Sequence, residues 1–157
     1  MRRILPVPFA WLFVSVFLVS VAPAAAEDAA FTRVLEPYLR IQSQLALDSM
    51  KGVKEDAEAV GRHARALGAP GAAVVDQAAS VSRAADLAAA RRAFGELSEA
   101  LMAYADRNGL ALPAGVEAKY CAMAKKSWFQ QGAPVRNPYY GKAMLTCGEP
   151  RPRPATP

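Results

Sequence analysis

Histidine and cysteine, the residues that most often carry metal or catalytic chemistry, are scarce in this chain. There is one histidine, His63, and there are two cysteines, Cys121 and Cys147, among 157 residues. A zinc site with four Cys or His ligands is therefore not available, and a blue-copper site, which takes two histidines, is excluded as well. The sequence also lacks a glycine-rich phosphate loop and the Cys-x-x-Cys-His sequence of covalent haem attachment.

Catalytic arrangements are equally sparse. His63 lies between Arg62 and Arg65 on an expected helix, and nothing marks it as a base held beside a nucleophile. The acidic residues are spread along helix faces, and no carboxylate pair sits in an apolar setting that would separate their pKa values. We therefore expect His63 to be a surface residue and the protein not to be an enzyme.

No uninterrupted apolar run has the length that a transmembrane helix needs. The run from Phe9 to Ala22 has 14 residues, whereas a transmembrane helix needs about 20. Arg2 and Arg3 precede this run and an Ala-Ala-Ala sequence at 24–26 follows it, which is the pattern of a secretory signal peptide. We expect residues 1–26 to be removed and the protein to be periplasmic, without a membrane span. A retained membrane anchor is the weaker alternative.

Net charge argues against nucleic acid as a partner. The formal charge of +5 falls to +3 when Arg2 and Arg3 leave with the signal segment, which holds no acid, and nucleic-acid binding needs a stronger basic stripe. The charge is unevenly distributed, however. From Lys119 to Pro157 there are seven Lys or Arg residues and one acid, Glu149. This excess is either a solvated flank or a face for an acidic partner.

Helical periodicity dominates the chain between Asp28 and Gly109. Apolar residues recur at spacings of three and four, which indicates helices that bury one face. Pro37 predicts a kink or a helix that begins at Glu36, and Asp86 is the expected N-cap of the last helix. Four helices with short links predict a mainly α protein, a small antiparallel bundle. The stretches are Phe31–Leu45, Val53–Leu67, Ala72–Val81 and Leu87–Tyr104.

The segment after Leu110 has a different character. Pro113, Gly115, Pro134 and other breakers predict an irregular loop with one or two short strands, which completes a domain over residues 27–148. Residues 149–157 are proline-rich and charged and have almost nothing to bury. We expect them to form a disordered tail.

Two mirrored pairs of sulfur residues lie in this irregular segment, Cys121 with Met123 and Met144 with Cys147. In an extended stretch the first pair shares one face, and on a helical turn the second pair does too. Thiolate and thioether sulfurs are soft ligands that select monovalent copper. The pattern is consistent with a Cu(I) site of up to four sulfurs.

A disulfide is the competing interpretation of the same cysteines. Exported proteins with an even number of cysteines usually pair them, and a bridge between Cys121 and Cys147 would close a loop worth roughly 3 to 4 kcal/mol on the chain-entropy model. Met123 and Met144 would then be ordinary packing residues. From the residues alone, both interpretations stay open.

The sulfur pairs and the residues between them resemble a known family. Cys121-x-Met123, Trp128, Asn137-Pro-Tyr-Tyr-Gly141 and Met144-Leu-x-Cys147-Gly148 together resemble the signature of domain-of-unknown-function family 3347. The family is a small exported helical domain, found alone or appended to adaptor subunits of copper and silver efflux pumps. It usually has proline where this chain has Ala122.

The resemblance implies a role in handling heavy metals. It favours Cys121, Met123, Met144 and Cys147 as ligands of Cu(I) or Ag(I), and a copper or silver efflux system or another envelope protein as partner. The alternative function is a disulfide-stapled module that docks an envelope protein through the basic C-terminal face without metal. A shared family does not by itself establish a shared function.

Overall fold

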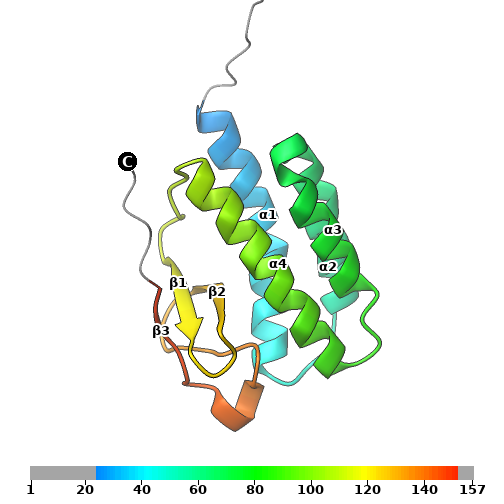
Figure 1. Ribbon diagram of the computed structural model, residues 1–157, viewed down its shortest axis with the longest axis vertical. Coiled ribbons are helices and arrows are strands. Elements are labelled where there is room, and N and C mark those ends of the chain that lie inside the picture. The colour runs from blue at the N-terminus through cyan, green and yellow to red at the C-terminus, as the bar shows by residue number, and fades with distance from the viewer. Residues whose placement is uncertain (1–23, 152–157) are drawn as a thin grey trace, which may run out of the picture.

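Four helices and a three-stranded antiparallel sheet make up the described part of the protein, which is a computed structural model covering residues 24–151 (Figure 1). The prediction of a mainly α bundle is confirmed. The helices are α1 (Ala24–Ala46), α2 (Val53–Ala64), α3 (Ala72–Ser82) and α4 (Leu87–Arg107), with short 3-10 helices η1 (Arg65–Leu67), η2 (Ala69–Gly71) and η3 (Gly141–Met144). The strands are β1 (Val116–Cys121), β2 (Lys126–Gln131) and β3 (Glu149–Pro150).

The expected signal segment falls almost entirely outside these residues. Of residues 1–26, only Ala24 to Ala26 are described, and they form the first turn of α1. Within residues 24–151 no helix combines the length and the apolar character that a bilayer span requires.

Helix α4 follows the sequence pattern closely. Asp86 has an extended backbone and its carboxylate accepts a hydrogen bond from the Ala89 N–H at 2.7 Å, so it is the N-cap that the sequence predicts. Phe94, Leu97 and Leu101 line the buried face. The apolar period and the N-cap together therefore specify where this helix begins and which face it buries.

Helix α1 differs from the prediction at Pro37. The helix runs unbroken from Ala24 to Ala46 with Pro37 inside it, so a start at Glu36 is wrong. Phe31 and Val34, which precede the proline, are fully buried in the core. Burying them stabilises the first three turns enough to offset the backbone hydrogen bond that the proline ring removes.

The core joins the helices to the sheet through aromatic side chains. The rings of Tyr38 and Phe94 stack with centroids 4.9 Å apart, and Phe31 meets Phe129 of β2 edge to face at 6.3 Å. The Tyr38 hydroxyl lies 2.7 Å from Ser98 Oγ and accepts a hydrogen bond from the Phe129 N–H at 3.1 Å. One side chain of α1 thus bonds to both α4 and β2.

The C-terminal segment is more regular than the sequence predicts. Its strands pair in the order β2-β1-β3, and β1 lies antiparallel to both neighbours. Glu149 pairs with Tyr120, and the Arg151 N–H donates to the Ala118 carbonyl at 2.9 Å. The expectation of disorder from residue 149 onward is therefore wrong for residues 149–151, because the free edge of β1 offers them backbone partners. Residues 152–157 lie outside the described part.

Candidate metal centre

The two cysteines meet at one end of the sheet, as a pair of free thiols. Cys121 is the last residue of β1 and is fully buried, whereas Cys147 follows η3 and is partly exposed. Their Sγ atoms are 3.7 Å apart. The fold therefore brings together two cysteines that are 26 residues apart in sequence.

Hydrogen bonds give the two thiols different acidities. Burial by itself raises the pKa of Cys121, but hydrogen bonds from the Ala124 N–H, from Asn137 and from the Cys147 thiol outweigh it and hold that pKa below its usual value. The pKa of Cys147 is raised, first by its hydrogen bond to Cys121 and then by burial and the negative charge of Cys121. Cys121 is thus the more acidic thiol of the pair, and Cys147 the less acidic one.

Asn137 is the polar centre of the loop that carries Cys147. Its side chain is fully buried; Nδ2 donates to the Cys147 carbonyl at 2.7 Å, and Oδ1 accepts from the N–H groups of Tyr139 and Tyr140 at 2.8 and 3.3 Å. This one amide fixes the turn and the position of Cys147 together.

The two methionines lie in different settings. Met123 is in the turn between β1 and β2 and is 63% exposed, so Cys121 and Met123 do not share the extended stretch that the sequence analysis assumed. Met144 ends η3 and is partly buried, and its carbonyl accepts a hydrogen bond from the Cys147 N–H at 3.0 Å. Met144 and Cys147 are joined by one hydrogen-bonded turn, and Cys147 itself lies outside η3.

Aromatic rings pack against the cysteine-bearing loop. Trp128 is fully buried and meets Tyr139 edge to face, with ring centroids 5.8 Å apart. A Cβ on Gly148 would come within 2.5 Å of the Trp128 ring, so only glycine fits directly after Cys147. The Tyr139 hydroxyl donates a short hydrogen bond to the Ser127 carbonyl.

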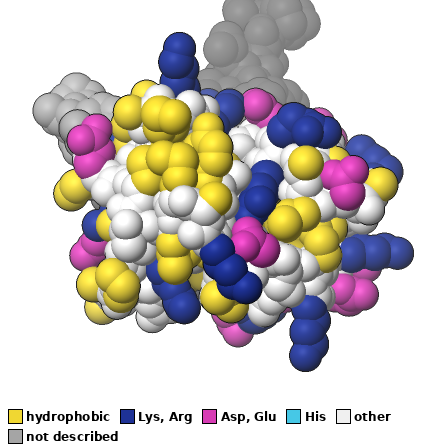
Figure 2. All heavy atoms as spheres, turned by 90° about the horizontal axis from the view of Figure 1, so that it is seen from below, with side chains coloured by type: hydrophobic (Ala, Val, Ile, Leu, Met, Phe, Trp, Pro, Cys, Tyr) yellow, Lys and Arg dark blue, Asp and Glu magenta, His cyan; other side chains and the backbone are white. Residues whose placement is uncertain are grey.

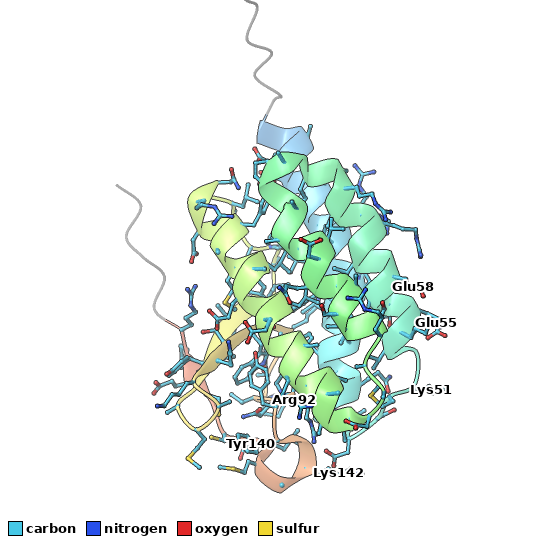
Figure 3. All side chains as sticks on the ribbon, turned by 45° about the vertical axis from the view of Figure 1, so that its right-hand side comes forward. Lys51, Glu55, Glu58, Arg92, Tyr140 and Lys142 are labelled. Carbon is cyan, nitrogen blue, oxygen red and sulfur yellow. The ribbon has the colours of Figure 1, made fainter. Side chains whose placement is uncertain are left out.

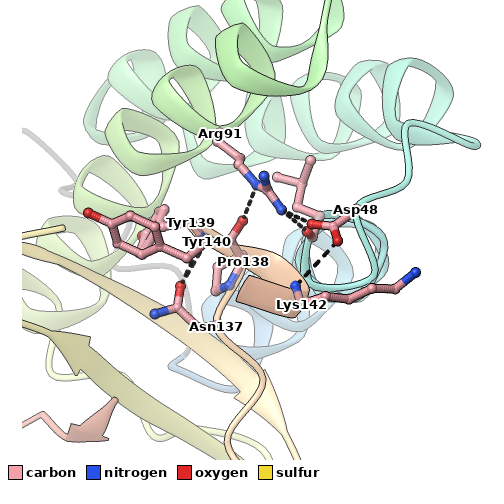
Figure 4. A network of polar contacts seen from close by, with 8 residues as sticks. Asp48, Arg91, Asn137, Pro138, Tyr139, Tyr140 and Lys142 are labelled. Carbon is pink, nitrogen blue, oxygen red and sulfur yellow. Dashed lines mark hydrogen bonds and ion pairs between the residues drawn. The ribbon is translucent and has the colours of Figure 1, made fainter. Parts of the chain in front are cut away.

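An ion pair that the sequence analysis missed holds the Asn137–Gly141 turn against the helices (Figure 4). The Arg91 guanidinium donates to the Pro138 carbonyl at 2.9 Å and pairs with Asp48 at 2.5 Å, and Asp48 also accepts from the Lys142 N–H at 3.3 Å. A Cβ on Gly141 would collide with the Asp48 carboxylate, which explains a glycine there. Because Asp48 and Arg91 are 43 residues apart, no local pattern reveals their pairing.

The sulfur atoms are the metal-binding groups that the site offers. Within residues 24–151 no group of three or more His, Cys, Asp or Glu side chains is arranged to hold a metal ion. His63 is exposed on α2, as the sequence analysis expected. The donor atoms that the fold brings into contact are therefore the two thiols, which differ in acidity, and Met123 and Met144 lie close to them in sequence.

Comparison with known proteins identifies no relative. No family model, no curated protein and no solved structure matches this chain.

Proposed function

We propose that this protein is exported to the periplasm and binds one monovalent soft metal ion, Cu(I) or Ag(I), in copper handling or efflux, and that it has no enzymatic activity. Cys121 and Cys147 are the principal ligands, and Met123 and Met144 complete the site. The observation that carries the proposal is the contact between the two free thiols at 3.7 Å. The resemblance of the C-terminal segment to a family that accompanies copper and silver pumps supports it.

The separation of the sulfurs favours a bent chelate. At a metal–sulfur distance of about 2.3 Å, the value for thiolate on zinc, sulfurs 3.7 Å apart subtend about 107° at the metal. A linear two-coordinate ion would need them about 4.6 Å apart at the same bond length. An angle near the tetrahedral value leaves room for one or two further ligands. This is the role that we assign to the thioethers, which need no deprotonation.

The acidity of the pair supports the same role. A metal ligand must be the thiolate, and the hydrogen bonds to Cys121 lower the pKa of its thiol despite burial. Cys147 would release its proton when the metal binds, because the metal replaces the hydrogen bond between the sulfurs.

A disulfide-stapled envelope module is the second candidate function. The same 3.7 Å contact favours it, since sulfurs that already touch need only a small movement to reach a bonded distance of about 2.05 Å. Counting the free thiols of protein isolated from the periplasm separates the two. Two blocked thiols with no bound metal support the disulfide.

An anaerobic competition titration with a chromogenic Cu(I) chelator tests the proposal. We expect the reduced protein to take up one ion per chain, and Cys121→Ser or Cys147→Ser to weaken binding by far more than tenfold, because a charged soft donor is lost. Met123→Leu and Met144→Leu should weaken it less. Met50→Leu, at a methionine between α1 and α2, is the matched control.

Two results would contradict the proposal. If the wild-type protein does not compete with the chelator, the cysteines are structural. If it competes and both serine variants bind as tightly, the ion is held elsewhere.

A further inference from the structure

A groove of about 440 Å³ runs along the first half of α4, next to the thiol pair. Ala88 and Gly95 of α4 contribute no bulk to its lining, Ala124 and Lys126 approach from the strand hairpin, and Tyr140 comes from the turn before η3. This volume lies within the range of natural ligand sites. The groove is lined by three segments, two of which also hold the cysteines.

Basic side chains without an ion-pair partner among the described residues lie in the lining of the groove and next to it. Lys126 is paired with Glu96 at 2.9 Å, but Arg92 and Lys125 are exposed and form no ion pair within the part of the chain that is described. Arg92, Tyr140 and Lys142 lie toward the same end of the molecule (Figure 3). Viewed from that end, Lys and Arg side chains project beside hydrophobic surface (Figure 2).

This charge restricts how a cation reaches the sulfurs. Like charges repel, and a basic rim lowers the local concentration of a free monovalent metal ion. The same rim attracts an acidic protein surface and speeds its association. Delivery by an acidic partner therefore fits the site better than capture of the free ion.

The length of the groove fits an extended chain. Ala88 and Glu96, at its two ends, are eight residues apart on α4, which corresponds to about 12 Å along the helix axis. An extended peptide covers that length with about three or four residues. A small anion such as a carboxylate would occupy only a fraction of it.

The groove is directly connected to the sulfur site. Ala124 lines it, and the Ala124 N–H donates to Cys121 Sγ at 3.4 Å. Met123, the preceding residue, is 63% exposed in the same turn. A chain lying in the groove would therefore be beside the most exposed sulfur ligand and against the turn that holds the buried one.

We propose that this groove docks an extended acidic segment of the protein that exchanges metal with the thiol pair. The identity of the partner as a metal-exchange protein rests on the proposed function, whereas the docking itself does not need metal. Met123 would be the first ligand to share the ion with the docked segment, because it alone of the four sulfur residues is largely exposed.

The test uses a synthetic peptide of aspartate and glutamate with a central methionine, and a neutral peptide with asparagine and glutamine in their place. Without metal, we expect the acidic peptide at low salt to shift the backbone amide NMR signals of Arg92, Ala124 and Tyr140. Arg92→Glu should weaken this binding at least about tenfold, and salt should weaken it too. Lys54→Glu, the same charge change on an exposed residue of α2, should bind as the wild type does.

The second arm measures Cu(I) transfer from the acidic peptide by stopped flow. Arg92→Glu should slow transfer about tenfold while equilibrium Cu(I) affinity is unchanged, because docking and not coordination is impaired. If the protein binds no Cu(I) yet the peptide still shifts the groove signals, the proposed function fails and the docking site stands.

Three outcomes overturn the docking proposal while leaving metal binding intact. In the first, the amide signals that the peptide shifts lie away from the groove. In the second, the neutral peptide binds equally well. In the third, free glutamate alone reproduces the shifts, which indicates a small-anion site.

Discussion

At the scale of single residues, two buried polar side chains connect the parts of the molecule that position the thiols. Tyr38 bonds to Ser98 of α4 and to the backbone of Phe129 in β2. Asn137 ties the Cys147 carbonyl to the two tyrosines of its own turn. A buried donor or acceptor that loses its partner costs more than a hydrogen bond gains on average, so both residues are sensitive positions.

Replacing Tyr38 by phenylalanine tests the first connection. Tyr38→Phe leaves the buried Phe129 N–H without its side-chain acceptor and removes the contact of the Ser98 hydroxyl with Tyr38. We expect a loss of about 1 to 3 kcal/mol in the free energy of unfolding, measured by urea denaturation. Tyr120→Phe, on the partly exposed strand β1, should change it by less than about 0.5 kcal/mol. Equal effects of the two substitutions would mean that the Tyr38 hydroxyl does not bridge helix and sheet.

Replacing Asn137 by alanine tests the second connection. Asn137→Ala removes the hydrogen bonds to the Cys147 carbonyl and to the two tyrosine N–H groups, as well as the one to Cys121, from a fully buried site. We expect a loss of about 2 kcal/mol or more, and faster alkylation of both thiols because the loop that covers them opens. Gln42→Ala is the control, because Gln42 is also buried and holds the Arg136 carbonyl at 2.6 Å. It should destabilise the protein without increasing thiol reactivity, and a similar increase in both variants would contradict the role given to Asn137.

At the scale of elements, the end of α1, the first half of α4 and η3 are joined by charge. The Arg91 guanidinium, through its hydrogen bond, lowers the pKa of Asp48, with the Lys142 N–H and charge adding to the effect against the cost of burial. A carboxylate whose pKa is lowered by folding stabilises the fold above its unfolded pKa, and that contribution is lost as the pH falls through the folded value. The contacts of Asp48 with Arg91 and Lys142, which join these three elements, are therefore intact at neutral pH and weaken in acid.

Asp48→Asn should weaken the contacts with Arg91 and Lys142 at neutral pH. We expect faster hydrogen exchange at the Lys142 and Gly141 amides than in the wild type. In the wild type the same loosening should set in as the pH falls below about 4, the ordinary pKa of aspartate, and it should be absent from the pH dependence of the variant. A wild-type exchange rate at Lys142 that follows only the intrinsic pH dependence would contradict this assignment.

Predictability also differs between elements. Periodicity and a capping aspartate suffice for α4, because both signals are local. Helix α1 passes through Pro37 because burial of the side chains before the proline outweighs the backbone hydrogen bond that the proline removes. A sequence pattern does not show which of these two free energies is larger. Strand β3 has two residues and no period, and it exists because residue 149 reaches Tyr120. Long-range pairings such as this one have no local signature.

At the scale of the whole molecule, the fold brings two cysteines that are 26 residues apart in sequence into contact at one end of the sheet. The sequence identified the four sulfur residues, but the spacing of the cysteines did not determine that their Sγ atoms touch. The different exposures of Met123 and Met144 could not be predicted from the sequence either, since they depend on the hairpin turn and on η3. The helices provide a rigid support, to which β2 is attached by its buried aromatic residues.

Metal should stabilise this whole unit. A ligand that binds only the folded state adds about 2.7 kcal/mol at a free concentration one hundred times its Kd. We expect Cu(I) supplied through a chelator buffer to raise the urea midpoint of the reduced wild-type protein and to leave that of Cys121→Ser unchanged. A comparable rise in both proteins would show that the stabilising ion binds outside the thiol pair.

X-ray absorption spectroscopy of the anaerobically loaded protein tests the central claim most directly, because it reports the atoms bound to copper. The account predicts Cu(I) with a first shell of sulfur alone, three or four atoms, at about 2.3 Å, and a reduced sulfur count in Met123→Leu or Met144→Leu. A shell of nitrogen or oxygen atoms, or copper that does not stay with the reduced protein, would contradict it and leave Cys121 and Cys147 as a structural pair.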